Sequence, residues 1–171
     1  MEARLYKRKS LKMGDMAGRI ELRPAQTNDL ETIALMMDYL GYPVLPSELK
    51  PILSDILSNP AVKVFLGVNE DGKPMGLISL HCYPALRLKG YQVSLEELVV
   101  HPDFRGQGVG KKLLNFAREY AEEKRAVRLE VTTSNKRKSF RRKFYGKNGF
   151  EYAGSSVYRI NLKLEDYRAI A

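Results

Sequence analysis

The sequence predicts one mixed α/β domain of the α+β type, with a central sheet of six to seven strands and helices on both faces. Three observations support this prediction. Apolar strand-like segments flank the turn Asn69-Glu70-Asp71-Gly72, as in an antiparallel hairpin. A strand, a glycine-rich turn, a helix and a strand then follow over 91–133, an order that places two strands parallel. A chain of 171 residues has room for one such domain and is too short for two.

The chain is expected to begin with a flexible basic extension. Residues 1–18 are polar and show neither a helical nor a strand period. The folded domain should cover 19–171 and start with a short strand at 20–24.

Two helices are predicted before the hairpin. Asn28 and Glu31 stand at the spacing of a capping box, and the helix that they open should end at Gly41. A second helix is expected over 47–58, with Pro51 in its first turn. Its buried side is predicted to consist of the apolar residues Leu49, Ile52, Leu53, Ile56 and Leu57.

The remaining elements follow from the same periodicities. Strands are expected at 62–68, 74–83, 91–100 and 127–133, with a helix over 108–124 before the last of them. After them come a basic helix over 136–148, closed by Gly149, and a final hairpin of 150–152 with 157–162.

The composition indicates a cytoplasmic protein without a disulfide or a metal site. No apolar run approaches the roughly 20 residues of a membrane helix, and the basic start lacks the apolar region of a secretory signal. Cys82 is the only cysteine, so no intramolecular disulfide can form. With His81 and His101 as the only histidines, a zinc site would need mostly carboxylate ligands.

The net charge of +9 is concentrated in two segments. Residues 1–19 and 136–147 hold 13 of the 29 basic residues, and the rest of the chain is nearly neutral. A positive stripe of this kind can bind an RNA or DNA backbone, attract a polyphosphorylated small molecule, or form a solvated helix face. Charge alone leaves these three possibilities open.

A glycine-rich turn over 101–111 is the most informative segment. Gly106, Gly108 and Gly110 alternate at the start of a predicted helix. Glycines let the backbone approach a ligand closely, while unpaired amides and the positive end of the helix dipole point outward. The turn is therefore a candidate anion site, with an ordinary glycine-rich loop as the alternative.

Two common phosphate-binding loops do not fit this spacing. A Walker loop would need glycine and serine or threonine at the positions of Arg105 and Lys112. A dinucleotide fingerprint would need glycine at the position of Leu113, and its turn would follow the strand directly. Glu130, at the distance of a ribose-binding acid, lies inside a predicted strand. A nucleoside triphosphatase and a Rossmann enzyme are both disfavoured.

Two blocks of sequence point to one family. Residues 98–110, which read Leu-Val-Val-His-Pro-Asp-Phe-Arg-Gly-Gln-Gly-Val-Gly, resemble the acyl-CoA signature of the GNAT superfamily of N-acyltransferases. Residues 143–150 resemble the family's Phe-Tyr-x-Lys-x-Gly-Phe segment, and the order of elements from 19 to 162 matches its sheet. The resemblance implies a sheet splayed between its fourth and fifth strands and an acetyl-CoA-dependent N-acetyltransferase.

The resemblance also implies how acetyl-CoA is held. Backbone groups of Leu98, Val99 and Val100 would pair with the pantetheine arm like an added strand, and an amide near Val99 would polarise the thioester carbonyl. Lys111 would add charge beside the pyrophosphate. The pyrophosphate itself would be bound by the backbone amides of Arg105, Gly106, Gln107, Gly108, Val109 and Gly110.

Three residues are candidates for proton transfer. An alkyl amine, with a pKa near about 10, must lose a proton before it attacks. The resemblance favours Glu97 as that base, directly or through water, and Glu96 is the second choice. Adjacent strand residues point to opposite faces unless a bulge intervenes. Tyr145 matches the family tyrosine that protonates the departing thiolate. The alternatives are a solvated strand edge or salt bridge for the glutamates, and a core aromatic role for Tyr145.

Some positions depart from the family pattern. Arg141 stands where a small residue is usual, and Lys138 replaces a common asparagine. Asn135 is expected to take over that polar contact with the cofactor. The adenosine 3′-phosphate is within the expected reach of Lys136, Arg137 and Arg142, which an exposed helix face would explain equally well.

The acceptor amine is not determined by the sequence. Its pocket is expected from 36–60 and 83–92, and the basic chain favours neutral or acidic amines over polycations. A catalytically silent CoA-binding domain is one alternative function. Another is a protein acetyltransferase associated with the ribosome or with nucleic acid through 136–147. No membrane partner is expected, and a homodimer is compatible with the family.

Overall fold

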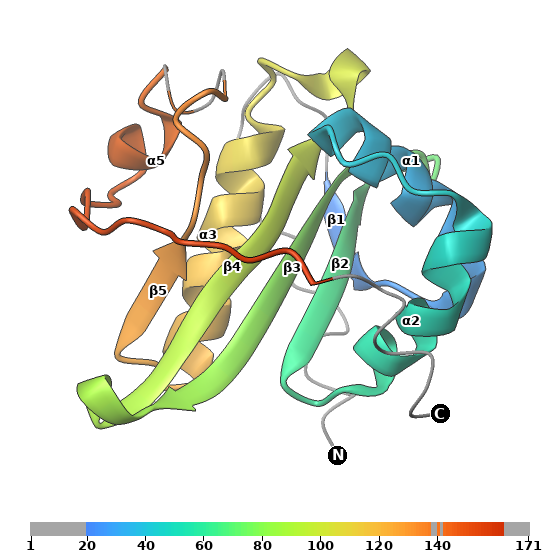
Figure 1. Cartoon of the computed structure of the whole chain (residues 1–171). Helices are drawn as coiled ribbons and strands as arrows, with labels where there is room; N and C mark the ends of the chain where they lie inside the picture. Colours follow the sequence, from blue (N-terminus) through green and yellow to red (C-terminus); the bar gives the residue numbers. More distant parts are fainter. Residues whose placement is uncertain (1–19, 138–139, 141, 163–171) are drawn as a thin grey trace. The chain divides into compact units, whose positions relative to one another are not determined.

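The computed structural model describes residues 20–137, 140 and 142–162 (Figure 1). The chain divides into two compact units, Met1–Ser134 and Asn135–Ala171. The sheet and the three longer helices belong to the first unit, and the second contains one short helix. The expected basic extension at 1–18 lies outside the described residues.

The first unit is built on a mixed five-stranded sheet in the order β1-β2-β3-β4-β5 (Figure 1). Its strands are β1 (Glu21–Pro24), β2 (Val62–Val68), β3 (Pro74–Ala85), β4 (Gly90–Val100) and β5 (Arg128–Val131). The first four strands pair antiparallel, and β4 pairs parallel with β5. The predicted hairpin and the predicted parallel pair are both confirmed.

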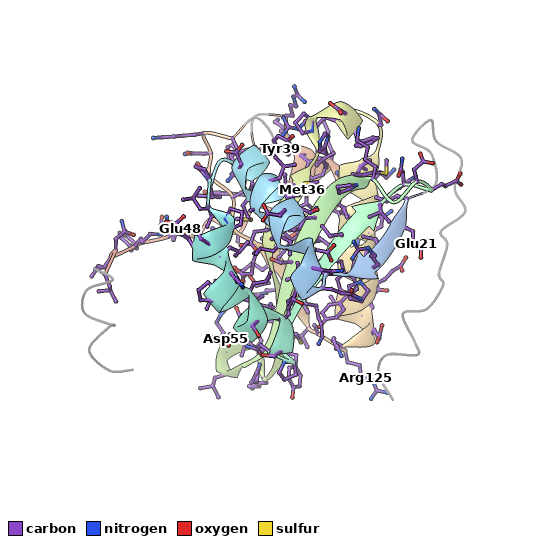
Figure 2. The ribbon with its side chains drawn as sticks, turned by 90° about the vertical axis from the view of Figure 1, so that its right-hand side faces the viewer. Glu21, Met36, Tyr39, Glu48, Asp55 and Arg125 are labelled. Atoms are coloured by element: carbon purple, nitrogen blue, oxygen red, sulfur yellow. The ribbon has the colours of Figure 1, made fainter. Side chains whose placement is uncertain are left out.

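Helices cover both faces of this sheet. One face packs against α1 (Leu30–Leu40) and α2 (Pro46–Ser58), whose Ile33, Met36 and Leu53 form a buried cluster with Leu66, Leu77 and Val99. Figure 2 views the molecule from this side, with Met36 and Tyr39 labelled on α1 and Glu48 and Asp55 on α2. The other face packs against α3 (Val109–Glu123), where the Phe116 ring lies 4.6 Å from that of Phe65.

Besides the helical residue Phe140, the described chain contains four short helical segments with described bounds. They are η2 (Thr27–Asp29), η3 (Leu86–Leu88), η4 (Pro102–Phe104) and α5 (Phe144–Lys147). Within the described ranges, no helix has both the length and the apolar character to cross a lipid bilayer.

The start of α1 differs from the prediction. The helix begins at Leu30, and the expected capping pair of Asn28 and Glu31 is wrong. Asp29 instead accepts a hydrogen bond from the Gln26 amide at 2.8 Å and two from the Arg23 guanidinium at 2.8 and 2.7 Å. A buried carboxylate with a charged partner on β1 outweighs the local capping signal.

Two further predictions concern the residue that ends α1 and the positions of Pro51 and Ile52 in α2. Gly41 ends α1 with φ 89°, as predicted. The helix α2 begins at Pro46, so Pro51 lies inside it and not in its first turn. Ile52 is 50% exposed and was wrongly assigned to the buried side. It lies about 100° around the helix from the buried Leu53, beyond the apolar stripe.

The C-terminal predictions hold only in part. Within the expected helix over 136–148, the described residues are helical at Phe140 and in α5, and Lys143 between them adopts a left-handed conformation with φ 53° that interrupts the helix. Lys138 and Arg141 lie outside the described residues. The expected hairpin of 150–152 with 157–162 forms no strand in the described chain. The sheet has five strands in the described chain, and the predicted six to seven are not confirmed.

Candidate functional site

The turn between β4 and α3 depends on glycine for its backbone shape. Gly106 and Gly108 have φ of 78° and 84°, a region that residues with side chains rarely adopt. Gly108 is the N-cap of α3. A Cβ added at either glycine would meet no atom within 4 Å. The glycines are therefore required for conformation, since space around them is open.

The later backbone amides of this turn, from Gly106 onward, have no hydrogen-bond partner among the described residues. Those of residues 106–111 donate no hydrogen bond to any described residue, while the Lys112 amide bonds to Gly108 O at 3.1 Å. Unpaired amides at a helix N-terminus carry partial positive charge and bind anions. The Arg105 amide differs from its neighbours, because it already donates to Pro102 O at 3.2 Å. Free amides for an anion thus begin at Gly106.

The side chains of the turn brace the loop. Arg105 Nε donates to Val100 O at 3.0 Å, and its Nη2 reaches Tyr39 O on α1 at 3.4 Å. Gln107 Nε2 donates to Asp103 O at 2.7 Å. These bonds hold the backbone in place, so a ligand at the turn would meet main chain more than side chain.

The first residues of α3 separate buried from exposed groups. Val109 is almost completely buried and anchors the helix in the core. Gly110 is half-buried and Lys111 is exposed. The ammonium of Lys111 is therefore accessible to an anion bound at the turn.

The two parallel strands part beside this turn. Pairing of β4 with β5 ends at Leu95 opposite Val131, but β4 continues to Val100. Among the described strands, none pairs with 96–100 on the side of β5. This is the divergence that the family resemblance implied. Thr133 Oγ1, just beyond β5, is buried and has no hydrogen-bond partner in the described chain. The open edge leaves backbone groups available to an extended ligand.

A β-bulge in β4 decides where the two candidate glutamates point. In the register with β3, Ser79 faces Glu97 and Leu80 faces Leu95, so Glu96 is an extra residue. The bulge places Glu97 on the sheet face that α1 and α2 cover, where it pairs with Ser79. Glu96 is exposed and Glu97 is half-buried.

Glu97 is held by a buried serine. The Ser79 hydroxyl accepts a hydrogen bond from the Glu97 amide at 3.1 Å and donates one to Glu97 Oε2. Burial raises the pKa of Glu97, the Ser79 hydrogen bond lowers it, and the charge of Glu96 raises it, in that order of size. A carboxylate with a raised pKa on a half-buried strand has the character of a general base.

A polar row continues along the same face from Glu97 toward the β3–β4 connection. It contains Ser94 and Gln92 on β4 and His81 and Tyr83 on β3, which the register places opposite one another. Alternation along β3 places the last two on the face of Leu77. Gln92 is only 1% exposed. The sheet face thus changes from apolar under α1 and α2 to polar beyond Glu97.

The candidate acid lies in the second unit. Tyr145 is part of α5, and its ring lies 5.2 Å from that of Phe144 and 5.7 Å from that of Phe150. Burial raises the pKa of Tyr145, and the charge of Arg137 lowers it to a smaller extent. Asn135 is exposed in a turn of the same unit. The other predicted site residues, including both glutamates, belong to the first unit.

Several polar residues of this region were not predicted from the sequence. Ser79 and Gln92 interrupt otherwise apolar strands. A polar residue that is buried in such a strand requires a hydrogen-bond partner, so its presence in the sequence indicates a polar contact. The unpartnered hydroxyl of Thr133 carried no sequence signal. Within the described part of the chain, no group of His, Cys, Asp or Glu has the geometry of a metal site.

Comparison with known proteins identifies the family. The family model described as "Acetyltransferase (GNAT) family" matches residues 28–150. The aminoalkylphosphonate N-acetyltransferase of Salmonella typhimurium is 33% identical over 132 residues, which cover 77% of this chain and 84% of that protein. An uncharacterized N-acetyltransferase of Methanocaldococcus jannaschii is 38% identical over 84 residues, or 47% of this chain and 36% of that protein.

Solved structures agree with these relatives. A Trypanosoma brucei acetyltransferase superposes with a TM-score of 0.69 at 26% identity, covering 84% of this chain and 99% of its own. The chain therefore belongs to the GNAT family and is an acyl-CoA-dependent acetyltransferase. The resemblance found in its glycine turn is confirmed at the level of the family.

Proposed function

We propose that this protein transfers an acetyl group from acetyl-CoA to a primary amine by direct attack in a ternary complex. The observation that carries the proposal is the open stretch of β4. Among the described residues, this stretch combines a strand edge at 96–100 that no strand pairs with on the side of β5, amides at 106–111 without a hydrogen-bond partner, and a carboxylate of raised pKa at Glu97. These groups follow one another within 16 residues of one strand and its turn.

The chain offers matching groups for each part of acetyl-CoA. Amides from Gly106 onward fit the diphosphate, and Lys111 adds a positive charge. The backbone of 98–100 fits the amide groups of the pantetheine arm, with the Thr133 hydroxyl as a further polar group beside the parted strands. Asn135 is proposed as a polar contact from the second unit.

Proton transfer is assigned to two residues. Bound acetyl-CoA supplies the acyl thioester. Glu97, oriented by Ser79, accepts a proton from the acceptor ammonium, directly or through water, and the neutral amine then forms the C–N bond as the C–S bond breaks. Tyr145 donates a proton to the departing sulfur, the nitrogen of the new amide releases its second proton to solvent, and the phenolate of Tyr145 regains a proton from solvent. Backbone amides of Val99 and Val100 stabilise the negative charge that develops on the carbonyl oxygen.

The acceptor is proposed to be a small-molecule amine. The Salmonella relative, 33% identical, is named for activity on aminoalkylphosphonates, which are small amines. The basic chain, with net charge +9, also disfavours polycationic acceptors. Cytoplasmic location is proposed as well, since acetyl-CoA is a cytoplasmic metabolite.

A thiol-release assay tests this function. Purified protein is incubated with acetyl-CoA and a panel of primary amines, and free CoA is measured with a thiol reagent while the acetylated product is confirmed by mass spectrometry. Turnover with at least one amine, lost in Glu97→Gln, is the expected result. Tight CoA binding in calorimetry without turnover of any amine would favour a silent CoA-binding domain and contradict the proposal.

A further inference from the structure

A chain of hydrogen bonds ends on an exposed arginine near the β3–β4 connection. Arg87 Nη2 donates to Gln92 Oε1 at 2.9 Å, and Gln92 Nε2 donates to the Tyr83 hydroxyl oxygen at 2.8 Å. The middle member of this chain, Gln92, is 1% exposed, whereas the side chain of Arg87 is 59% exposed. A buried amide therefore holds a solvent-accessible guanidinium.

The orientation of Gln92 is determined by its two partners. The Arg87 guanidinium can only donate, so it must face the amide oxygen of Gln92, and the amide nitrogen is then left to donate to the Tyr83 hydroxyl, which can accept. A buried amide without both partners would cost free energy. The hydrogen bonds that link Tyr83, Gln92 and Arg87 thus hold the Arg87 guanidinium in one place. Less conformational entropy is therefore lost when that guanidinium binds a ligand.

The guanidinium retains donors for a ligand. Glu130 Oε2 lies 3.7 Å from Arg87 Nη2, an ion pair beyond hydrogen-bond distance. Within the described chain, the bond to Gln92 is the one hydrogen bond that Arg87 donates. A guanidinium has five N–H donors and matches the two oxygens of a carboxylate or phosphonate.

Arg87 is bound to a residue on the same sheet face as Glu97. Gln92 and Ser94 follow Glu97 along that face of β4, and Ser94 pairs with Glu130 of β5. Arg87 contacts Gln92 and Glu130, and Glu130 stands opposite Ser94. At about 3.3 Å per ladder step, the Cα of Glu97 lies about 7 Å along the strand from that of Ser94 and about 13 Å from that of Gln92. An amine joined to an acidic group by an alkyl chain, with a hydrogen bond at each end, covers the shorter part of this range.

We infer that the acceptor amine carries an acidic group, a phosphonate or a carboxylate, and that Arg87 binds this group while the amine faces Glu97. The inference rests on the proposed function and adds the substrate class. Glu130 competes with the ligand for Arg87, so it weakens binding of the acidic group. Tyr83 and Gln92 act on the ligand through Arg87 and are positioning residues.

The test compares acceptors that differ only in charge. Values of kcat/KM are measured for 2-aminoethylphosphonate, β-alanine, 3-amino-1-propanol and 1,3-diaminopropane with acetyl-CoA at saturation. The wild type is expected to prefer an acidic amine over the neutral alcohol by about 10-fold or more. The first two amines distinguish phosphonate from carboxylate. Equal rates for acidic and neutral amines, or a preference for the diamine, would overturn the inference.

Variants locate the recognition. Arg87→Gln should lower kcat/KM for the acidic amine about 10- to 100-fold and for the neutral amine less than about 3-fold. Glu130→Gln should raise kcat/KM for the acidic amine about 2- to 5-fold, because the competing carboxylate is removed. The ratio of the two substrates within one variant does not depend on the folded fraction, so partial unfolding cannot produce the result.

Arg128→Gln is the matched control. Arg128 Nη1 lies 3.8 Å from Glu130 Oε2, much as Arg87 Nη2 does, but in the described chain the Arg128 guanidinium donates no hydrogen bond to Gln92 Oε1. Its acid-to-neutral ratio should stay within about 3-fold of wild type. A ratio that falls in Arg128→Gln and not in Arg87→Gln would overturn the assignment.

A binding measurement separates this inference from the proposed function. If no amine is acetylated, the proposed function fails, and calorimetry with 2-aminoethylphosphonate then decides the anion site. Binding to the wild type that is lost in Arg87→Gln and kept in Arg128→Gln supports the site. No binding to the wild type, or equal binding to all three proteins, overturns it.

Discussion

The hydroxyl of Ser79 contacts both the backbone amide and the carboxylate of Glu97 across two antiparallel strands. A bulge one residue away turns this carboxylate to the face that α1 and α2 cover, while Glu96 stays exposed. The strand carries this pair at the point where its pairing with β5 has ended. One structural feature therefore distinguishes two neighbouring glutamates, of which the sequence favoured Glu97 only through the family resemblance.

Glu97→Gln should lower kcat/KM about 100-fold or more, because a general base contributes about 10²–10⁴ to the rate. The matched control Glu96→Gln should change it less than about 5-fold, since that side chain is exposed and extra to the ladder. Thiol release with one fixed amine measures both. The reverse order of effects would transfer the role of base to Glu96.

The pH profile of Ser79→Ala tests the positioning of Glu97. A base acts when deprotonated, and burial raises the pKa of Glu97, so kcat/KM should rise with pH through a value above that of an ordinary glutamate. The Ser79 hydrogen bond lowers this pKa, and its loss should move the rising limb to higher pH.

Ser79→Thr retains a hydroxyl and should keep the limb near its wild-type position. The same amine is used throughout, so titration of the acceptor is common to all profiles. If the rising limb of the kcat/KM pH profile stays at its wild-type position in Ser79→Ala while the rate falls, Ser79 has only a structural role.

Tyr145→Phe should lower kcat about 10- to 100-fold and leave CoA affinity unchanged, because the phenol is proposed to protonate the leaving thiolate. The ring contacts with Phe144 and Phe150 do not require the hydroxyl. Tyr158→Phe is a control in the same unit, since Tyr158 is 94% exposed. A wild-type kcat in Tyr145→Phe would remove the tyrosine from the mechanism.

Gly108→Ala should weaken CoA binding by about 10-fold, because alanine disfavours the φ of 84° by roughly 1–2 kcal/mol and the amides must shift. Gly72→Ala is the matched control. Gly72 has φ 77° with open space around it, but lies in the β2–β3 turn.

Both variants should lose similar stability in thermal unfolding, and only Gly108→Ala should lose CoA affinity in calorimetry. Equal CoA affinity in the two variants would contradict the assignment of the diphosphate to this turn.

Elements with strong local signals were predicted correctly. The hairpin around Gly72, the helix α3 and the left-handed end of α1 at Gly41 all depend on residues close in sequence. Predictions failed where a distant partner or a backbone irregularity intervened. Asp29 at the start of α1 is bonded to Arg23 of β1, and the left-handed Lys143 interrupts the predicted basic helix.

The sequence by itself determined the family, the parallel pair β4–β5 and the glycine turn, because these follow from short-range periodicity and from residue types at fixed spacing. Only the tertiary structure decided which glutamate points along the polar face and which arginine is held beside it. Both depend on cross-strand contacts, Ser79 with Glu97 and Tyr83 with Gln92, between residues 18 and 9 positions apart. A bulge reverses side-chain parity without leaving a mark in the local pattern, so such pairings become visible only when the strands are in register.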